Sequence, residues 1–394
     1  MSKEMTINTQ AIGTRGPDQT DASDLNLLRS ILREFCAEQM PSPHPQAPSD
    51  GFDRTLWRRI AHELDLMGFS IPTEFGGAGF SWAAHAVVFE ELGRSLTALP
   101  YFASVALATT ALLATPDDKA KARYLPGLAD GSRVGALAIT DDPHNEVVQA
   151  WSVREHFRLG GRKLFVLHAQ HADLLLVSAK VKGAGALFAV EASAAGVVVE
   201  PVNSLDLTRG VAEVSMTNVP ADLIGEIGAA PNYLRRARDL ANGALSAEQA
   251  GGIQRCLEMS VAHATDRYQF GRAIGSFQAI KHKCVDMLVQ LELARSLALD
   301  ACSSAALGSE TLSLAASSAC AYATTAYQSV AAETIQIHGG IGFTWEHEAH
   351  LHFRRATANA TLHTSARQLR EAIAHLCCTD PAQRPNISDG PALQ

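Results

Sequence analysis

The spacing of apolar residues divides this chain into three successive regions, and their order limits the possible folds more than any other feature. Up to about residue 131, apolar residues such as Leu28, Ile31 and Phe35 recur every three or four positions, which is typical of amphipathic helices. From about 134 to 226, short runs rich in Val, Leu and Ile alternate with turn residues, which predicts strands. From 237 to 375 the helical period returns in long segments.

The patterns predict individual elements in each region. A helix is expected from Trp82 to Leu96. Glycine pairs in the middle region, including Gly160-Gly161, predict turns between strands. The predicted strands are Gly135–Ile139, Lys163–Leu167, Asp173–Ser178, Ala186–Val190, Val197–Val202 and Ala212–Val219. The predicted long helices are Ala237–Tyr268, Phe277–Leu307, Thr311–His338 and Trp345–His375.

Together these elements predict an α+β fold with an N-terminal α-helical domain, a middle β-barrel domain and a C-terminal four-helix bundle. No long helix separates the predicted strands, which favours a barrel over an open parallel sheet. The expected domains are residues 24–133, 134–230 and 231–378, flanked by loose tails at 1–23 and 379–394.

Composition excludes several classes of protein. Of 394 residues, 47% are apolar and 19% charged, which argues against a disordered chain. The net charge of −8 argues against a nucleic-acid-binding surface. No apolar run approaches the roughly 18 residues of a membrane span, and the polar N-terminus lacks a signal sequence. Seven cysteines without a C-x-x-C pair fit free thiols. We therefore expect a cytoplasmic protein.

A segment between two predicted helices carries the first candidate site. Arg267 and Arg272 could clamp a phosphate, because a guanidinium offers two parallel donors. Phe270 could cover a nucleobase, and Gln278 could donate to a pyrophosphate. The same residues also fit an ordinary helix–helix corner with solvated arginines, and their chemistry alone leaves both interpretations open.

A glycine-rich turn is the second candidate. Gln336 and His338 precede Gly339, Gly340 and Gly342. Such glycines end a helix and let backbone N–H groups approach a phosphate. They also fit a plain helix end and turn, so this motif by itself is weak evidence of a ligand.

A histidine-rich run, from Trp345 to His352, follows that turn. Histidines at helical spacing suggest a metal site, but the H-E-x-x-H pattern is absent, because His347-Glu348 is followed by His350 one position early. A polar helix face near a subunit contact is the better interpretation, and we predict no metal.

Several segments in order along the chain resemble the acyl-CoA dehydrogenases, flavoproteins that introduce an α,β double bond into acyl-CoA thioesters. The resemblance spans about Leu56 to Ile373 and agrees with the three-region fold. Each motif is moderately specific, and their common order makes the set strong. The motifs are MGFSIPTEFGGAG at 67–79, FEELGR at 89–94, GRKLFV at 161–166, Arg267-x-x-Phe270-Gly271, Phe277-Gln278 and Gln336-x-x-Gly339-Gly340-x-Gly342.

The resemblance implies a carboxylate base that removes the α-proton, FAD as acceptor of the β-hydride, and hydrogen bonds that polarise the thioester carbonyl. The base is where this chain departs from the family. At the common position of the catalytic Glu it has His363, and at the alternative position it has Ala241. Histidine titrates near neutral pH, so His363 is the candidate base.

In the family, two subunits hold one FAD. This chain keeps the set that the resemblance assigns to the neighbouring subunit: Arg267, Phe270, Gln278, Gln336, Gly339 and Gly340. The set that the resemblance assigns to the host subunit differs from the family pattern. Phe165-Val166-Leu167 replaces the family's Trp-Ile-Thr or Trp-Ile-Ser, and the loop that begins at Thr140 lacks its usual glycine and serine. Phe165, Thr140 and Ser365 remain candidate FAD contacts on the host side.

This one-sided retention predicts a subunit that completes the FAD site of a homologous catalytic partner, as in bacterial α2β2 members of the family that act on bulky acyl-CoA thioesters. One alternative is a self-sufficient homomeric flavoenzyme with His363 as base or with altered flavin chemistry. Another is a flavin-free scaffold or binding protein on the same fold. The resemblance implies an acyl-CoA substrate and an electron-transferring flavoprotein or similar acceptor, and it does not indicate the acyl group.

Overall fold

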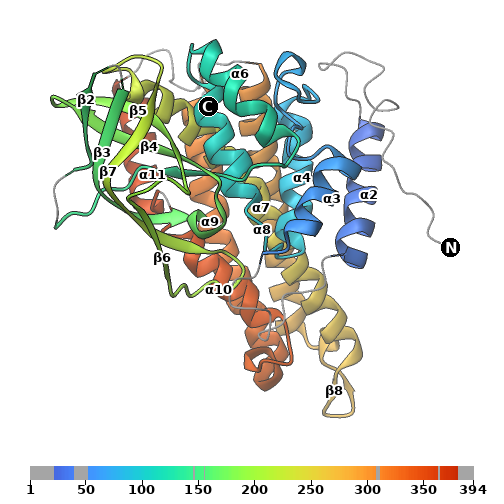
Figure 1. Ribbon diagram of the computed structural model, residues 1–394. Helices are drawn as coiled ribbons and strands as arrows, with labels where there is room; N and C mark the ends of the chain where they lie inside the picture. The colour runs from blue at the N-terminus through green and yellow to red at the C-terminus, as the bar shows by residue number, and fades with distance from the viewer. Residues whose placement is uncertain are drawn as a thin grey trace, which may run out of the picture.

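The chain folds into a helical N-terminal part, a β-barrel and a long helical bundle, as the computed structural model shows (Figure 1). The structure describes residues 22–39, 52–144, 147–154, 156–307, 311–362 and 364–379. The N-terminal part comprises α2 (Ala22–Gln39), α3 (Arg54–Leu64), η1 (Thr73–Phe75), α4 (Trp82–Arg94), the π-helix η2 (Phe102–Thr109), α5 (Thr110–Leu113) and α6 (Asp118–Ala129).

The middle region closes into a barrel. Strand β4 pairs with β2, β2 with β3, β3 with β7, β7 with β5, and β5 returns to β4, while β1 extends from β4 and β6 from β7. Apolar side chains such as Leu175, Val177, Phe188 and Val214 fill the interior. The strands are β1 (Gly135–Ala138), β2 (Gln149–Val153), β3 (His156–Leu167), β4 (Leu174–Val181), β5 (Ala184–Glu191), β6 (Val197–Val202) and β7 (Val211–Ile224).

One predicted turn is wrong: Gly160 and Gly161 lie inside β3. The pairing register of β3 with β7 shifts between Leu159 and Gly161, which marks a β-bulge. Gly161 has φ of +133°, and a Cβ there would lie 2.9 Å from the Cα of Val148. These glycines therefore serve a close backbone approach within a strand rather than a turn. Strand β2, which was not predicted, is short and mostly exposed.

The C-terminal region is built from α7 (Ala230–Asp266), α8 (Gln278–Ala306), α9 (Leu312–His338), α10 (Ala349–Asn359) and α11 (Ala366–Thr379). Between α7 and α8 lie a hairpin of β8 (Tyr268–Gln269) and β9 (Arg272–Ala273) and the short η4 (Ile274–Ser276); η5 (Gly339–Phe343) follows α9. None of the helices in the described ranges is long and apolar enough to cross a membrane.

Glycines let α7 pack unusually close to α4. A Cβ added at Gly93 of α4 would lie 2.0 Å from the carbonyl oxygen of Glu248, and one at Gly251 of α7 would lie 1.8 Å from that of Glu90. Neither position can hold a side chain without moving a helix, so the crossing fixes the N-terminal helices against the bundle. The predicted domain boundaries themselves remain predictions.

The prediction of one helix from Trp345 to His375 is also wrong, because α10 ends at Asn359 and α11 begins at Ala366. The segment between them contains no glycine or proline that would have indicated a break. Tertiary contacts end the helix instead: the amide oxygen of Asn359 accepts a hydrogen bond from Arg209, and Leu362 packs against the main core.

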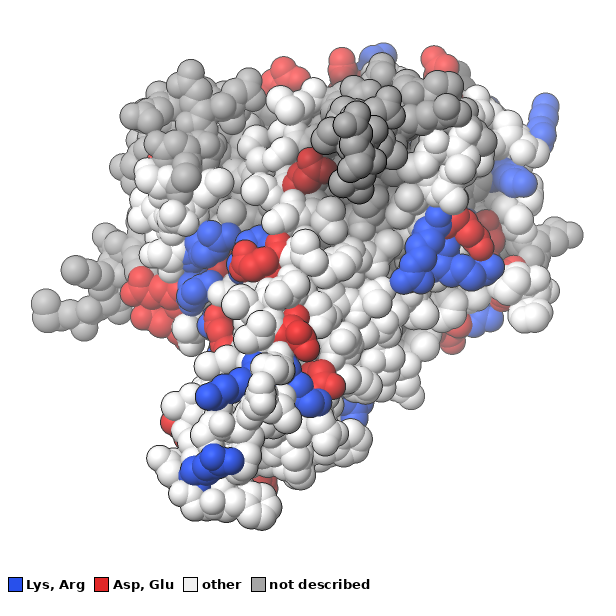
Figure 2. All heavy atoms as spheres, turned by 180° about the vertical axis from the view of Figure 1, so that it is seen from behind, with Lys and Arg blue, Asp and Glu red and all other residues white. Residues whose placement is uncertain are grey.

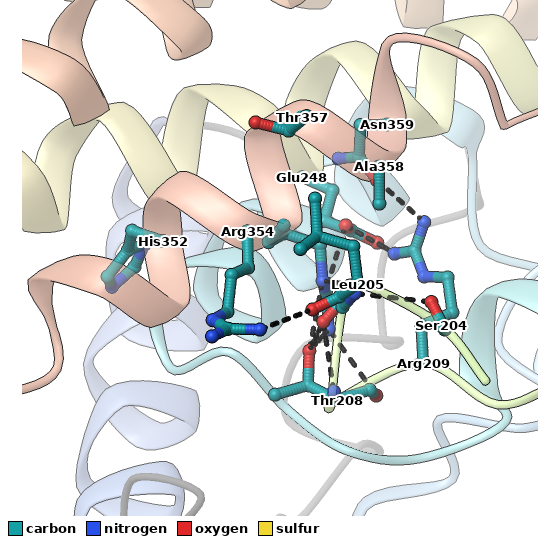
Figure 3. Close-up of polar contacts among 12 residues, drawn as sticks. Ser204, Leu205, Thr208, Arg209, Glu248, His352, Arg354, Thr357, Ala358 and Asn359 are labelled. Carbon is teal, nitrogen blue, oxygen red and sulfur yellow. Dashed lines mark hydrogen bonds and ion pairs between the residues drawn. The ribbon is translucent and has the colours of Figure 1, made fainter. Parts of the chain in front are cut away.

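A buried ion network joins the barrel to the bundle (Figure 3). Arg355 of α10 contacts Asp206 at 2.5 Å and Glu248 of α7 at 2.9 Å. Arg209, from the loop between β6 and β7, donates to both carboxylate oxygens of Glu248 at 2.5 and 2.7 Å. All four side chains are at most 8% exposed. The loop that carries Asp206 and Arg209 is thus fixed to two helices of the bundle.

The four charges of the network balance, which is the condition for burying them. Burial alone would raise the pKa of both carboxyl groups, yet Arg355 and Arg209 hold the pKa of Asp206 and of Glu248 below the usual range. A carboxyl pKa that is lower in the folded chain stabilises the fold above about pH 4, and this stabilisation is lost as the pH falls through the folded-state pKa.

We therefore expect Glu248→Gln to lower the free energy of unfolding by about 3–5 kcal/mol, because it leaves two buried guanidinium groups with a single carboxylate. Urea unfolding at pH 7 measures the change. The matched control is Glu63→Gln, which breaks a half-exposed pair with Arg59 and should cost less than about 1 kcal/mol. Equal losses in the two variants would contradict a special role for the buried network.

Candidate functional site

A hairpin at one end of the bundle carries the first predicted site residues (Figure 1). Helix α7 ends at Asp266, and Arg267 adopts an extended backbone that leads into β8. Phe270 and Gly271 form the tip with φ of +54° and +77°, the left-handed pair that suits a two-residue hairpin turn. The Phe270 ring is 91% exposed. The Arg272 guanidinium lies 4.0 Å over the ring of Phe277.

The glycine turn lies at the end of α9. Gly339 has φ of +65° and ψ of −140°, a conformation that essentially only glycine adopts. No heavy atom lies within 4 Å of a Cβ added at Gly339 or at Gly340, so both face open space. Gly342 is different, because a Cβ there would lie 2.9 Å from the Cβ of His338. The turn thus combines a tightly packed glycine with two exposed ones.

The structure brings the hairpin and the glycine turn together at the same end of the bundle. The imidazole of His263, in the last turn of α7, stacks on that of His338, in the last turn of α9, with ring centroids 4.4 Å apart. Gln278 and Gln336 are both exposed beside these segments. At the lower end of the molecule, Figure 2 shows basic side chains set in a mostly uncharged surface. These six residues form what we call the bundle-end surface: Arg267, Phe270, Gln278, Gln336, Gly339 and Gly340.

Phe165 and Thr140 lie elsewhere, at the barrel. The backbone N–H of Leu164 donates to the carbonyl of Thr140 at 2.9 Å, and the register of β3 shifts between Lys163 and Val166. At this bulge Phe165 has φ of +54° and is 58% exposed. Its ring therefore lies partly in solvent.

A buried lysine holds this corner of the barrel together. The ammonium group of Lys163 is fully buried and donates to Asp141 at 2.6 Å and to Ser178 at 3.0 Å. Burial lowers its pKa, although Asp141 acts in the opposite direction. In the sequence, Lys163 is recognisable only as part of a family motif, and nothing in its neighbours along the chain indicates this buried pair.

A cavity of about 30 Å³ lies between the barrel and the helices. That volume holds about one or two water molecules. Nine of its ten lining residues are apolar or hydroxyl-bearing, and the tenth is Arg238; no carboxylate is among them. The lining is Leu107, Leu137, Ile139, Thr140, Leu164, Phe165, Leu167, Leu234, Arg238 and Leu362.

An open cleft of about 490 Å³ adjoins this cavity, because Leu234 and Arg238 line both. Lys180, Arg235 and Arg238 give the cleft a basic wall, and Asp141 lies at the same site. An anionic ligand would therefore find complementary charge here. Arg238 lines both the open cleft and the small cavity, a position that no pattern in the sequence indicates.

The candidate base and the last candidate FAD contact lie between α10 and α11. His363 is outside the described residues, so its role stays a prediction. Ser365 and Gln368 cap α11 reciprocally: the Ser365 N–H donates to the Gln368 side-chain oxygen at 2.9 Å, and the Gln368 N–H donates to the Ser365 hydroxyl at 3.3 Å. This capping role could have been found in the sequence Ser-Ala-Arg-Gln, and cofactor binding by Ser365 also stays a prediction.

The histidine-rich run forms no metal cluster. Within the ranges that the structure describes, no three His, Cys, Asp or Glu side chains are placed to hold a metal ion. His350 packs edge-on against Trp345 at 4.7 Å, and His352 bonds to the hydroxyl of Tyr327 at 2.8 Å. These histidines are thus engaged in packing and hydrogen bonding.

Two family models match the chain. Residues 22–132 match the acyl-CoA dehydrogenase N-terminal domain, and residues 235–375 match the acyl-CoA dehydrogenase C-terminal domain. A relative from Mycobacterium tuberculosis, acyl-CoA dehydrogenase IpdE2, is 36% identical over 354 residues, which cover 89% of this chain and 96% of the relative.

Solved structures have the same fold. A chain of the ChsE4-ChsE5 complex from Mycobacterium tuberculosis superposes with a TM-score of 0.82 at 26% identity, covering 92% of this chain and 100% of that one. Butyryl-CoA dehydrogenase from Megasphaera elsdenii superposes with a TM-score of 0.83 at 21% identity, covering 89% and 97%. The three-part architecture predicted from the sequence is thereby confirmed.

The two exposed glycines should respond differently to substitution. We expect Gly339→Ala to lower the free energy of unfolding by about 1–3 kcal/mol, because its backbone conformation strains any side chain. Gly340→Ala should change it by less than about 0.5 kcal/mol, since the added methyl group meets no atom. Thermal unfolding followed by circular dichroism compares them, and a Gly340→Ala loss as large as that of Gly339→Ala would contradict the open geometry at Gly340.

Proposed function

The chain belongs to the acyl-CoA dehydrogenase family, and on that basis we propose that it is the subunit that completes an FAD site on a homologous catalytic partner. The reaction is the α,β-dehydrogenation of an acyl-CoA thioester, in which FAD supplies the acceptor of the β-hydride. In this proposal the partner contributes the base and the flavin-ring pocket. This chain contributes the bundle-end surface.

The outward orientation of the bundle-end surface carries the proposal. Arg267 is exposed, and the backbone beside Gly339 and Gly340 is free of side chains. A guanidinium and an exposed backbone amide, that of Gly340, at the same end of the bundle fit a phosphate group. Phe270 offers an exposed flat ring of the kind on which a nucleobase stacks. Because these groups face outward, a dinucleotide bound to them would be shared with another subunit.

The small cavity at the barrel is the second support. A space of about 30 Å³ is too small for an acyl chain or a flavin ring, whereas ligand pockets commonly exceed about 300 Å³. Leu167 lines it where the family has a hydroxyl, and no carboxylate is among the lining residues. This chain keeps the residues that would contact the FAD of a neighbouring subunit, but the cavity beside its own Phe165 and Thr140 is small. Both features fit a subunit that completes the FAD site of a partner.

In the reaction, this chain would stabilise the charge of the dinucleotide and hold it in position. Arg267 would neutralise phosphate charge, and the backbone N–H of Gly340 would donate a hydrogen bond, so that the dinucleotide is held across the subunit boundary. The N–H of Gly339 already donates to the carbonyl of Ile335, and its lack of a side chain leaves the approach open. Proton removal would fall to the partner. An electron-transferring flavoprotein or a similar acceptor would then reoxidise the cofactor. The ChsE4-ChsE5 complex, a structural neighbour made of two named proteins, agrees with a two-chain assembly.

The open basic cleft favours a second candidate, a self-sufficient homomeric enzyme. Lys180, Arg235 and Arg238 could bind the phosphates of an acyl-CoA on this chain itself. In that case the purified chain alone would hold FAD, and its cavity would have to open when the thioester binds. His363 would be its base, so His363→Ala would lower the rate about 100-fold or more.

The proposal predicts that co-expression with a homologous partner chain gives a yellow complex whose flavin depends on Gly340. Gly340→Leu adds a side chain into open space and should leave unfolding unchanged while blocking the dinucleotide. Arg267→Ala should weaken FAD binding about 10- to 100-fold, the value of a charge-assisted contact. Flavin absorbance per complex and fluorescence titration measure both effects.

The matched control is Arg367→Ala on α11, whose side chain is 81% exposed and pairs with the exposed Glu371. Its complex should keep full flavin. A complex in which Gly340→Leu and Arg267→Ala also keep full flavin would rule out the bundle-end surface as an FAD contact.

A further inference from the structure

Three imidazole rings form a stack beside the bundle-end surface. His338 lies in the middle, with its ring centroid 4.4 Å from that of His263 and 4.3 Å from that of His347. The angle between ring planes is 29° for the first pair and 49° for the second. His338 is only 7% exposed. Three different elements therefore meet through these rings, which we call the histidine stack.

The rings of His263 and His338 belong to the two segments that carry the bundle-end surface. The carbonyl of His263 accepts the backbone N–H of Arg267 at 2.9 Å, so its ring lies one turn before that arginine. His338 directly precedes Gly339. Its own Cβ is where a side chain at Gly342 would clash. The stack thus sets how the Arg267 hairpin lies relative to the glycine turn.

Hydrogen bonds fix whether Nδ1 carries a proton in two of the rings. The carbonyl of Thr334 can only accept, so Nδ1 of His338 carries the proton in their 2.7 Å hydrogen bond. The backbone N–H of Ala349 can only donate, so Nδ1 of His347 is unprotonated in their 3.1 Å contact. Adding a proton to Nδ1 of His347 would set two donors against each other at the start of α10.

Protonation would also place like charges on rings stacked at about 4 Å. Burial first, and then the neighbouring histidines, lower the pKa of His263 and of His347. Among the charged neighbours, Arg267 lowers the pKa of His263 and Asp266 raises it, while Arg255 and His350 lower the pKa of His347 and Glu348 raises it. The downward causes prevail at both rings. Arg255 of α7 is itself paired with Glu348, and Glu333 of α9 is paired with Lys283 of α8.

We infer that the histidine stack is the positioning element of the bundle-end surface, and that it holds the Arg267 hairpin and the glycine turn in dinucleotide-binding register only while its rings are neutral. This inference rests on the proposed function. None of the three histidines needs to touch the dinucleotide. Because the pKa values of His263 and His347 are lower in the folded chain than the usual value near 6.5, the stack is intact above about pH 6.5 and is lost as the pH falls through the folded-state values.

Hydrogen exchange of the full chain alone tests the positioning role without any cofactor. Between pH 7.5 and 5.5, exchange at 267–271 and 339–343, corrected for its intrinsic pH dependence, should rise about 10-fold or more as the stack opens. His338→Phe keeps a flat ring but cannot be protonated, so its pH response should shrink to about 2-fold or less. His338→Ala should exchange fast at both pH values.

The matched control is His62→Phe, which makes the same change at an exposed histidine of α3 and should behave as wild type. Strand β4, inside the barrel, reports whether the whole chain loosens at pH 5.5. Wild-type exchange that is equal at both pH values, or a His338→Phe variant that responds to pH as wild type does, overturns the inference. If His338→Phe fails to fold, His347→Phe provides the same comparison.

A second arm uses the complex with the homologous partner and FAD as the probe. Release of FAD, followed by its fluorescence, should increase about 10-fold between pH 7.5 and 5.5 in wild type and far less in His338→Phe. A complex that never holds FAD refutes the proposed function even if the exchange data support the stack. A complex that holds FAD with the same pH dependence in both variants refutes the stack and leaves the proposed function intact.

Discussion

The buried ion network between Arg355, Asp206, Glu248 and Arg209 is the interaction on which the arrangement of this molecule depends. It ties a loop of the barrel to α7 and α10, so the barrel cannot rotate on the bundle without exposing or separating buried charges. Nearby, Gly93 and Gly251 allow α4 and α7 to approach so closely that the N-terminal helices follow the bundle. The small cavity at the barrel is lined by residues of both the barrel and the helices that these contacts hold in place.

The candidate binding groups lie at two places in this structure. Those at the end of the bundle, Arg267, Phe270, Gly339 and Gly340, are exposed, and Phe270 and Gly339 have positive φ angles. Those at the barrel line a cavity of about 30 Å³. A strained backbone conformation that supports no internal packing is typical of a segment that binds a ligand or a partner. The asymmetry agrees with a subunit whose cofactor contacts serve a site that it does not itself contain.

Much of this could be predicted from the sequence. Apolar spacing predicted the helix, barrel and bundle order, and the motifs predicted the family, because both depend on local patterns. The break between α10 and α11 could not be predicted, since it arises from Asn359 and Leu362 contacting distant residues. The strand across Gly160 and Gly161 was missed because glycine marks a bulge as readily as a turn. The histidine stack joins residues far apart in the chain, and only the fold brings them together.

Native mass spectrometry of the purified chain, first alone with excess FAD and then with its homologous partner, tests the central claim most directly. It counts flavins and chains in the same measurement. The account predicts no stoichiometric FAD on the chain alone and one FAD for each pair of unlike chains in the complex. A homo-oligomer that carries one FAD per chain would contradict it.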